Sequence, residues 1–284
     1  MSSTKRRPWM IALAAIGVAV LMLPLVQRVL HRHIIRYVYA TGAIDPAAYR
    51  TLTGKPAWHA SELEVEPGVK LKGIVRRPSA SDAPWIFFLT GNDQTPLITA
   101  QQFIENVRGD HDWGAAVYAY RGYDSSEGTP DRDDIAADML SVFHQLVEKE
   151  RVPAKRIHVA AFSLGAYFAS SVVAALPAAD KPGSLTLLAP AADIYMIRKS
   201  WAAPLLAGDR IETVPLLDKV PAPVLVLQGA DDQTTGVVQG KAVAGALGSK
   251  ARYQEFPGIG HTELLESTLA AAATRAGIEA QLAH

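Results

Sequence analysis

Short apolar runs alternate with longer amphipathic segments over most of this chain. Five runs are nearly continuous in apolar residues, as expected of parallel strands covered on both faces: 85–89, 115–120, 157–162, 185–189 and 224–227. Residues 131–149 instead repeat an apolar residue at every fourth position after Thr129-Pro130, which predicts a helix with one buried face. This alternation predicts a doubly wound, mostly parallel sheet with right-handed crossovers.

The start of the domain has a different pattern. Residues 62–66 and 69–75 flank Pro67-Gly68, so they are predicted to form a hairpin that leads into the parallel strands. No repeat of 20 to 50 residues divides the chain. Its 284 residues, 49% of them hydrophobic and 20% charged, fit one α/β domain over residues 60–284 with an additional segment before it.

An uncharged, mostly apolar run of 18 residues extends from 9 to 26. As a helix it would be about 27 Å long, which is close to the thickness of the bilayer core. Residues 1–36 are therefore predicted to form a single membrane anchor with basic flanks, and residues 37–59 a juxtamembrane linker. A cleaved signal peptide and a helix packed on the protein are the alternatives; the first plausible cleavage site, Val38-Tyr39-Ala40, lies far downstream.

Charge is distributed unevenly along the chain. Residues 1–36 hold six of the 28 Lys and Arg and none of the 28 Asp and Glu, so the rest carries 22 basic and 28 acidic side chains, a net charge of −6. This balance gives no reason to expect a nucleic-acid partner. Lys5-Arg6-Arg7 favours a cytoplasmic N-terminus and a periplasmic catalytic domain on a bacterial-type inner membrane, but the three arginines after the run leave the orientation open.

Ser163 stands between the apolar run that ends at Phe162 and a helical stretch that Pro177 closes. Ala161 and Gly165 supply the small residues that the sharp strand-to-helix turn of a nucleophile elbow requires. By itself this serine could equally be a helix N-cap. The next two predicted strands are followed by Asp231-Asp232 and by His261, so an acid and a base also end neighbouring strands, where functional residues of such sheets gather.

These motifs, in this order, make residues 60–280 resemble the α/β-hydrolase superfamily. Residues 120–128, Tyr-Arg-Gly-Tyr-Asp-Ser-Ser-Glu-Gly, closely resemble a segment of the branch that joins an N-terminal membrane segment to a compact hydrolase domain, and residues 89–92 occupy the place of its His-Gly oxyanion loop. The resemblance implies a serine hydrolase. It places the acid three residues after the turn glycine, which selects Asp232 rather than Asp231. The segment between the predicted strands 185–189 and 224–227 is long enough for a small helical cap over residues 191–220.

The resemblance also implies roles for individual residues. Ser163 would be the nucleophile, His261 its base, and Asp232 the group that fixes the histidine tautomer. The backbone N–H groups of Leu164 and Asn92 would bind the oxyanion, without need of the Asn92 side chain. Gly91 and Arg121 are expected to have structural roles near the site, Arg121 by bracing a loop through hydrogen bonds.

This sequence departs from the family pattern at three positions, namely Ala161 in the elbow, Thr90 in the oxyanion loop and Asp124 in the arginine segment. Ala161 is still small, and an aspartate tolerates left-handed backbone better than most residues. Thr90 replaces a histidine that could support the oxyanion loop, so the geometry of that loop is the least determined part of the resemblance.

No cofactor or metal is expected. The chain has no cysteine, and neither type of phosphate-binding glycine loop is present. His31 and His33 flank an arginine beside the apolar run, as an interfacial segment would. His158 and His144 fall within a predicted strand and helix, and the acids at 131, 133 and 134 suit the first turn of a helix.

The substrate is less determined than the reaction. Seven apolar or aromatic residues of the predicted cap could line an acyl pocket or merely cover the sheet: Tyr195, Met196, Ile197, Trp201, Pro204, Leu205 and Leu206. A small or lipid-like ester or thioester is the expected substrate. A serine aminopeptidase-like peptidase and a non-catalytic, membrane-attached binding protein remain alternatives, and the sequence does not indicate the oligomeric state.

Overall fold

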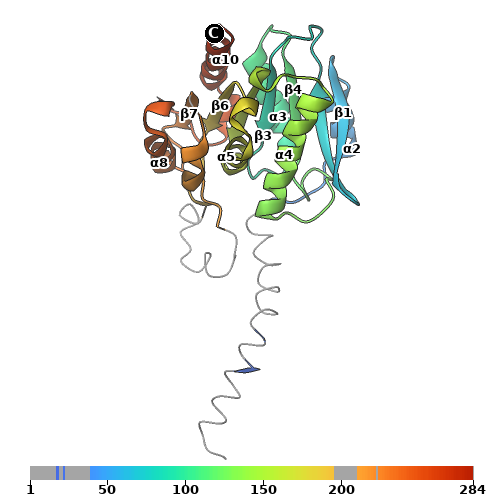
Figure 1. The fold of residues 1–284 in the computed structure, drawn as a ribbon, viewed down its shortest axis with the longest axis horizontal. Coiled ribbons are helices and arrows are strands. Elements are labelled where there is room, and N and C mark those ends of the chain that lie inside the picture. Colours follow the sequence, from blue (N-terminus) through green and yellow to red (C-terminus); the bar gives the residue numbers. More distant parts are fainter. Residues whose placement is uncertain (1–16, 19–21, 23–38, 195–209, 222, 284) are drawn as a thin grey trace, which may run out of the picture.

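The computed structural model describes residues 17, 18, 22, 39–194, 210–221 and 223–283. They contain an eight-stranded sheet in the order β1-β2-β4-β3-β5-β6-β7-β8 (Figure 1). Its strands are β1 (Trp58–Glu66), β2 (Val69–Arg76), β3 (Trp85–Leu89), β4 (Gly114–Tyr118), β5 (Ile157–Phe162), β6 (Ser184–Leu188), β7 (Val224–Gly229) and β8 (Ala251–Phe256). β1 and β2 pair antiparallel, as do β2 and β4, and all later pairs are parallel. The predicted hairpin and mostly parallel sheet are confirmed.

Helices cover both faces of this sheet (Figure 1). α3 (Pro96–Arg108), α9 (Glu263–Glu266) and α10 (Thr268–Leu282) contact one another on one side. The other side carries α4 (Arg132–Glu148), α5 (Gly165–Ala175) and α8 (Val237–Leu247), and α2 (Pro46–Thr53) lies against β1. Four short 3₁₀ helices complete the described elements: η1 (Ala154–Arg156), η2 (Ala178–Asp180), η3 (Val214–Lys219) and η4 (Gly248–Lys250). Because both faces are covered, β3, β4 and β5 are buried along their whole length, as their continuous apolar runs predict.

The periodic helix is α4, and its start follows from local chemistry. The Asp131 carboxylate accepts hydrogen bonds from the backbone N–H groups of Asp133 and Asp134, so Asp131 is the N-cap. The two following acids lie in the first turn, where the helix dipole favours negative charge. The acidic cluster at 131–134 is thus explained by the start of the helix.

The predicted membrane anchor, residues 9–26, lies outside the described residues except at 17, 18 and 22. No helix in the described ranges combines the length and the apolar character needed to cross a bilayer. The seven apolar residues named above for the cap also lie outside the described part of the chain. The ends of the cap segment lie side by side, because Asp193 bridges to Glu212 and the Thr213 hydroxyl donates to the Ala191 carbonyl at 2.6 Å.

The described part of the expected linker, residues 39–59, packs on the domain. Tyr39, Ile44 and Leu52 are buried members of the hydrophobic core. Trp58 already belongs to β1, and its indole N–H donates to the Glu105 carboxylate at 2.7 Å. The sequence around residue 45 is typical of a helix start, because the Asp45 side chain caps α2 and a proline lies in its first turn.

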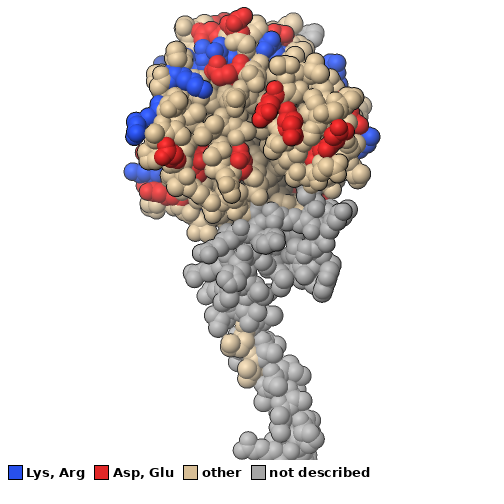
Figure 2. All heavy atoms as spheres, turned by 180° about the vertical axis from the view of Figure 1, so that it is seen from behind, with Lys and Arg blue, Asp and Glu red and all other residues tan. Residues whose placement is uncertain are grey.

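The surface of the domain carries both signs of charge. Seen from behind, acidic and basic side chains are interspersed, and neither sign dominates the visible described face (Figure 2). Oppositely charged side chains also pair locally on the surface, as Arg77 and Glu150 do at 2.6 Å. Exposed pairs of this kind stabilise a protein by only about 0–1 kcal/mol.

Candidate active site

Ser163 lies on the tight turn between β5 and α5. Its φ of +52° is in the left-handed region, which is unusual for a residue with a side chain. The turn is held by a hydrogen bond of 2.9 Å from Ser163 N–H to the Leu188 carbonyl. A Cβ at Gly165 would lie 2.5 Å from the carbonyl oxygens of both Leu89 and Thr90, so only glycine allows α5 to pass this close to β3. These are the features of a nucleophile elbow.

The structure brings Ser163, His261 and Asp232 together in one hydrogen-bonded chain. His261 Nε2 lies 3.1 Å from Ser163 Oγ, and His261 Nδ1 lies 2.8 Å from Asp232 Oδ2. The Phe162 ring packs on the imidazole with 4.7 Å between ring centroids. Asp231, the alternative acid, is exposed. In this arrangement the histidine can take the serine proton while the carboxylate holds the other ring nitrogen.

Asp232 is buried but fully supplied with donors. Its Oδ1 accepts the backbone N–H groups of Thr234 and Thr235 at 2.8 and 3.0 Å. Its Oδ2 accepts the Thr235 hydroxyl at 2.6 Å and the Gln228 amide at 2.8 Å, besides His261. Burial disfavours the carboxylate, but the hydrogen bonds from His261 and Thr235 outweigh it and hold the pKa of Asp232 well below its ordinary value. The acid is therefore ionised at neutral pH.

Gln228 and Thr235 were not identified from the sequence. Gln228 is a buried polar residue near the end of an otherwise apolar strand, and such residues need a polar partner. Thr235 follows the aspartate by three residues, a spacing at which backbone and hydroxyl donors can return to a carboxylate. Both signals are visible in the sequence, but neither identifies the partner without the fold.

The loop after β3 lies beside the elbow. A Cβ at Gly91 would lie 2.7 Å from the Phe162 ring and 3.3 Å from Ser163 Cβ, so glycine permits this approach. Within the described ranges, neither the Leu164 N–H nor the Asn92 N–H donates a hydrogen bond to another protein group. Two amide groups near the serine are thus available for an incoming oxygen atom.

Two of the three departures from the family pattern fit without disturbing the site. Ala161 is completely buried and pairs with Leu89 and Leu187 on the flanking strands. The Thr90 carbonyl accepts the Tyr120 hydroxyl at 2.7 Å, which fixes the start of the loop at the position where the family has a histidine.

Asp124, the third departure, has a φ of +44°, in the left-handed region expected at a position that is glycine in the family. Its Oδ2 accepts the Leu97 N–H at the start of α3 at 2.8 Å. Burial raises the pKa of Asp124 to about 6. The hydrogen bond from Leu97 lowers this pKa, and the nearby negative charge of Asp93 raises it further.

The raised pKa of Asp124 makes stability depend on pH. The folded protein binds this proton more tightly than the unfolded chain, whose pKa is about 3.9, so stability should fall as the pH rises from about 4 through 6. Asp124→Asn keeps the acceptor for Leu97 and removes the buried charge. We expect it to raise the free energy of unfolding at pH 8 by about 1–2 kcal/mol and to change it little at pH 4. Urea unfolding at both pH values checks this; a variant less stable at pH 8 would contradict it.

Arg121 braces the loop that follows β4, from outside the site. Its guanidinium binds both oxygens of Asp138 on α4, at 2.6 and 2.9 Å, and reaches Glu66 on β1 at 2.5 Å. Hydrogen bonds to Asp138 raise the pKa of Arg121, while burial opposes them. Arg121 therefore links the first strand, the loop after β4 and helix α4.

Ser163 and His261 open into a cleft of about 550 Å³. Nine further described residues line it: Asn92, Asp93, Thr99, Gln102, Phe162, Thr234, Thr262, Leu265 and Glu266. Two of them are carboxylates, and no lysine or arginine is among the described lining residues. The cleft therefore offers both an apolar wall and negative charge next to the reactive serine.

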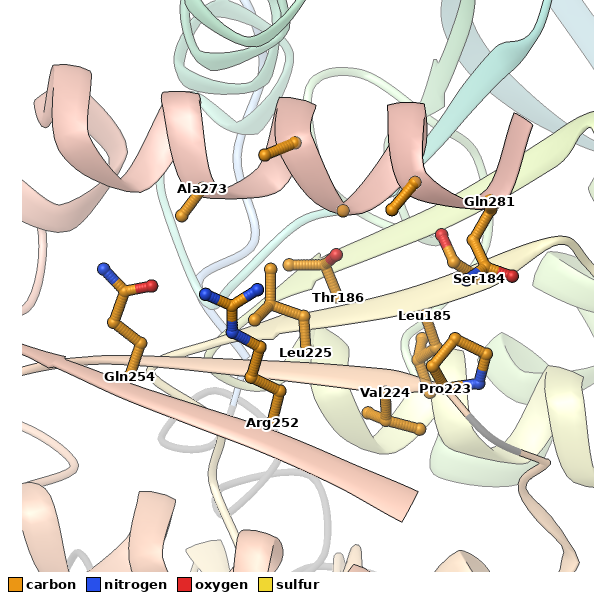
Figure 3. A pocket seen from close by; sticks show the side chains of 13 residues that line it. Ser184, Leu185, Thr186, Pro223, Val224, Leu225, Arg252, Gln254, Ala273 and Gln281 are labelled. Atoms are coloured by element: carbon orange, nitrogen blue, oxygen red, sulfur yellow. The ribbon is translucent and has the colours of Figure 1, made fainter. Parts of the chain in front are cut away.

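A second hollow of about 180 Å³ lies between α10 and the first residues of β6 and β7 (Figure 3). The Arg252 and Leu225 side chains point from the sheet toward the small residues of α10. Its described lining contains no histidine or carboxylate, and it is at the opposite end of the strands from Ser163. The cleft beside Ser163 and His261 is therefore the candidate active site.

Neither His144 nor His158 is among the described lining residues of the two hollows. His158 is buried in β5 with Nδ1 2.8 Å from the Ser184 hydroxyl, and burial lowers the pKa of His158 to about 4. It is neutral at physiological pH and belongs to the core. Across the described segments, no three His, Cys, Asp or Glu side chains are grouped so that they could hold a metal ion. His31 and His33 lie outside the described residues.

No protein-family model matches this chain. It is 27% identical over 216 residues to an uncharacterized protein found in two strains of Mycobacterium tuberculosis, and the match covers 73% of this chain and 74% of the relative. Because that relative is described only as uncharacterized, the match adds no function.

Several solved structures resemble this chain and identify its fold. An α/β-hydrolase of Vibrio vulnificus superposes with a TM-score of 0.68 at 16% identity, over 89% of this chain and 92% of its own. An esterase of Pyrococcus furiosus gives 0.67 at 14% identity, over 87% and 97%. A puromycin-hydrolyzing peptidase of Mycobacterium tuberculosis gives 0.58 at 18% identity, over 80% of this chain and 38% of its own. These likenesses show that the chain has the α/β-hydrolase fold.

Proposed function

From this fold and cleft, we propose that the chain is a serine hydrolase that cleaves a carboxylic ester or thioester through an acyl-enzyme on Ser163. The observation that carries the proposal is the hydrogen-bonded chain from Asp232 through His261 to Ser163, which ends at an open cleft. A serine hydroxyl is a weak nucleophile at neutral pH, and this geometry supplies the base that activates it.

In the first half-reaction, Ser163 Oγ bonds to the carbonyl carbon while its proton passes to His261 Nε2. Asp232 stabilises the resulting imidazolium and keeps the Nδ1 proton. The carbonyl oxygen becomes an oxyanion, which the N–H groups of Leu164 and Asn92 can bind. When the intermediate collapses, the alcohol or thiol leaves with the proton from Nε2, and the acyl group stays on the serine.

In the second half-reaction, water takes the place of the leaving group. His261 Nε2 accepts one proton of the water as its oxygen bonds to the acyl carbon. Collapse of this second intermediate releases the carboxylic acid and returns the proton to Ser163. The same three side chains thus serve both steps, and no external cofactor enters the balance.

Labelling with a fluorophosphonate probe tests the proposal, followed by a panel of neutral ester, thioester and amide substrates. Wild-type protein should be labelled, Ser163→Ala should not, and turnover should be found with an ester or thioester. A folded wild-type protein that neither reacts with the probe nor turns over any substrate would instead support a non-catalytic binding protein.

A peptidase acting on substrates with a free amino group is the second candidate. The observation that favours it is the pair of cleft carboxylates, Asp93 and Glu266, which could hold an ammonium group. Higher kcat/KM for an aminoacyl amide than for the matched acyl ester would select this alternative. The triad chemistry would be the same, with an amine as the leaving group.

The cleft carboxylates also predict a charge preference. A succinyl ester, with a free carboxylate, should have a lower kcat/KM than the matched neutral butyryl ester. Glu266→Gln should reduce the ratio of kcat/KM for the butyryl ester to kcat/KM for the succinyl ester about 3- to 10-fold, because one exposed charge at a few ångströms contributes about 1 kcal/mol. Glu263→Gln, an exposed acid outside the described cleft lining, is the matched control and should leave the ratio unchanged. An unchanged ratio in Glu266→Gln would contradict the prediction.

We also propose that residues 9–26 attach the domain to a membrane, with the catalytic domain on the periplasmic side. Deleting residues 1–36 should therefore release a soluble protein with full turnover of a short ester, because Tyr39 is the first core residue among those that the structure describes. Fractionation of both forms and an ester assay check this. An unfolded truncated protein would mean that the deleted segment belongs to the core.

A further inference from the structure

Three groups from distant parts of the chain meet at the Asn92 side chain. Asn92 Oδ1 accepts the Ala40 backbone N–H at 2.6 Å and the Tyr123 hydroxyl at 2.7 Å. The Ala40 N–H is also 3.0 Å from the Tyr123 hydroxyl oxygen. We call this set of three hydrogen bonds the Asn92 node.

The node fixes the direction of the Asn92 amide. A backbone N–H can only donate, so the side-chain oxygen, and not the NH₂ group, must face Ala40. The same residue lines the cleft with Ser163, and its neighbour Gly91 packs on the elbow. The node therefore connects the residue that offers a backbone N–H near the serine to the N-terminal part of the domain.

The N-terminal side of the node is firmly held. Residues 39–44, which we call the strap, have Tyr39 and Ile44 buried in the core. Gly42 N–H donates to the Gly122 carbonyl at 2.9 Å, and the Gly42 carbonyl accepts the Ser125 N–H at 3.1 Å. Ile44 N–H donates to the Ser125 hydroxyl at 3.2 Å. The strap thus runs along residues 122–125 and presents the Ala40 N–H from a fixed position.

We propose that the strap and the Tyr123 hydroxyl act through the Asn92 side chain to position the Asn92 backbone N–H for the oxyanion. This inference rests on the proposed hydrolase function. Backbone donors stabilise an oxyanion only where they are already aimed at it, and a loop after a strand needs such support. Tyr123 and Asn92 are positioning residues through their side chains. The chain that follows the predicted membrane segment is then part of the catalytic apparatus.

Two hydroxyl deletions separate positioning from simple stabilisation. Tyr123→Phe removes the hydroxyl that contacts both Asn92 and the strap, whereas Tyr49→Phe removes a hydroxyl that donates to the Gly73 carbonyl on β2 at 2.8 Å, outside the described cleft lining. We expect Tyr123→Phe to lower kcat about 10-fold with KM unchanged, since small displacements of catalytic groups reduce rate rather than binding. Tyr49→Phe should keep kcat within about 2-fold. Thermal unfolding of both variants shows whether they lose similar stability.

A double-mutant cycle tests whether Tyr123 acts through Asn92. Asn92→Ala removes the shared acceptor and should lower kcat at least about 10-fold, again at unchanged KM. The double variant should then be no slower than Asn92→Ala alone, because the Tyr123 hydroxyl has lost the group it positions. Multiplying losses would show that the two residues act independently.

The result that would overturn the inference is an active wild-type enzyme whose kcat is unchanged in Tyr123→Phe, or equally reduced in Tyr123→Phe and Tyr49→Phe. That outcome leaves the proposed function intact. A folded wild-type protein that neither binds the fluorophosphonate nor cleaves any ester, thioester or amide would overturn the proposed function and this inference together.

Discussion

Ser163→Ala is expected to abolish turnover while leaving the fold intact. The substitution deletes one oxygen atom from a side chain that lines the cleft, so the free energy of unfolding should change little. The hydroxyl, however, is the group that His261 faces at 3.1 Å and the only serine among the described residues of the cleft lining. Loss of such a nucleophile lowers kcat by about 10⁶-fold in well-studied serine hydrolases.

The measurement is kcat on an activated ester together with a thermal unfolding curve. Ser170→Ala, a buried serine on α5 away from the cleft, is a matched control that should keep its activity. If purified and folded Ser163→Ala kept more than about a hundredth of wild-type turnover, another nucleophile would have to be sought.

Asp232→Asn should lower kcat by about 10⁴-fold with little change in structure. Thr234 and Thr235 both donate backbone N–H groups to Oδ1, so the oxygen of the new amide should take that position. Its NH₂ group then faces His261 Nδ1, which must accept a hydrogen bond. The ring proton moves to Nε2, which faces Ser163 and can no longer take the serine proton.

Asp231→Asn is the control for this experiment and should change kcat by less than about 10-fold. Asp231 is exposed, and the interaction that holds its backbone is a hydrogen bond of 3.0 Å from its N–H to the Ile259 carbonyl. The side chain is not needed for that bond. Kinetics of both variants with one activated ester decide the assignment, and a larger loss in Asp231→Asn would move the acid by one residue.

The lowered pKa of Asp232 also bears on the pH dependence of stability and activity. The pKa of Asp232 lies well below its ordinary value in the folded protein, so its hydrogen bonds stabilise the fold above the ordinary pKa of about 3.9. That contribution is lost as the pH falls through the folded pKa. The acid limb of activity is therefore not expected to come from Asp232, and a loss near neutral pH would have to arise elsewhere in the site.

The order of the elements and the regions that meet at the site can be predicted from the amino-acid sequence alone. The buried strands are continuous apolar runs because both of their faces are covered, and such runs can be read without tertiary information. The start of α4 and the elbow around Ser163 depend on capping and on small residues, which act within a few positions. The parallel sheet then brings the ends of β5, β7 and β8 to one edge, which is why serine, acid and histidine could be predicted together.

The side chains that support the site could not be identified without the packed fold. Gln228 and Thr235 are polar residues whose hydrogen-bond acceptor cannot be identified from the sequence. In the fold both side chains donate to Asp232 Oδ2. Asn92 was expected to act through its backbone alone, yet its side chain joins Ala40 to Tyr123, residues 83 positions apart. The expected linker likewise holds residues that fill the core of the domain. Local patterns report hydrophobic periodicity and turn chemistry, whereas contacts across such separations depend on how the packed elements approach one another.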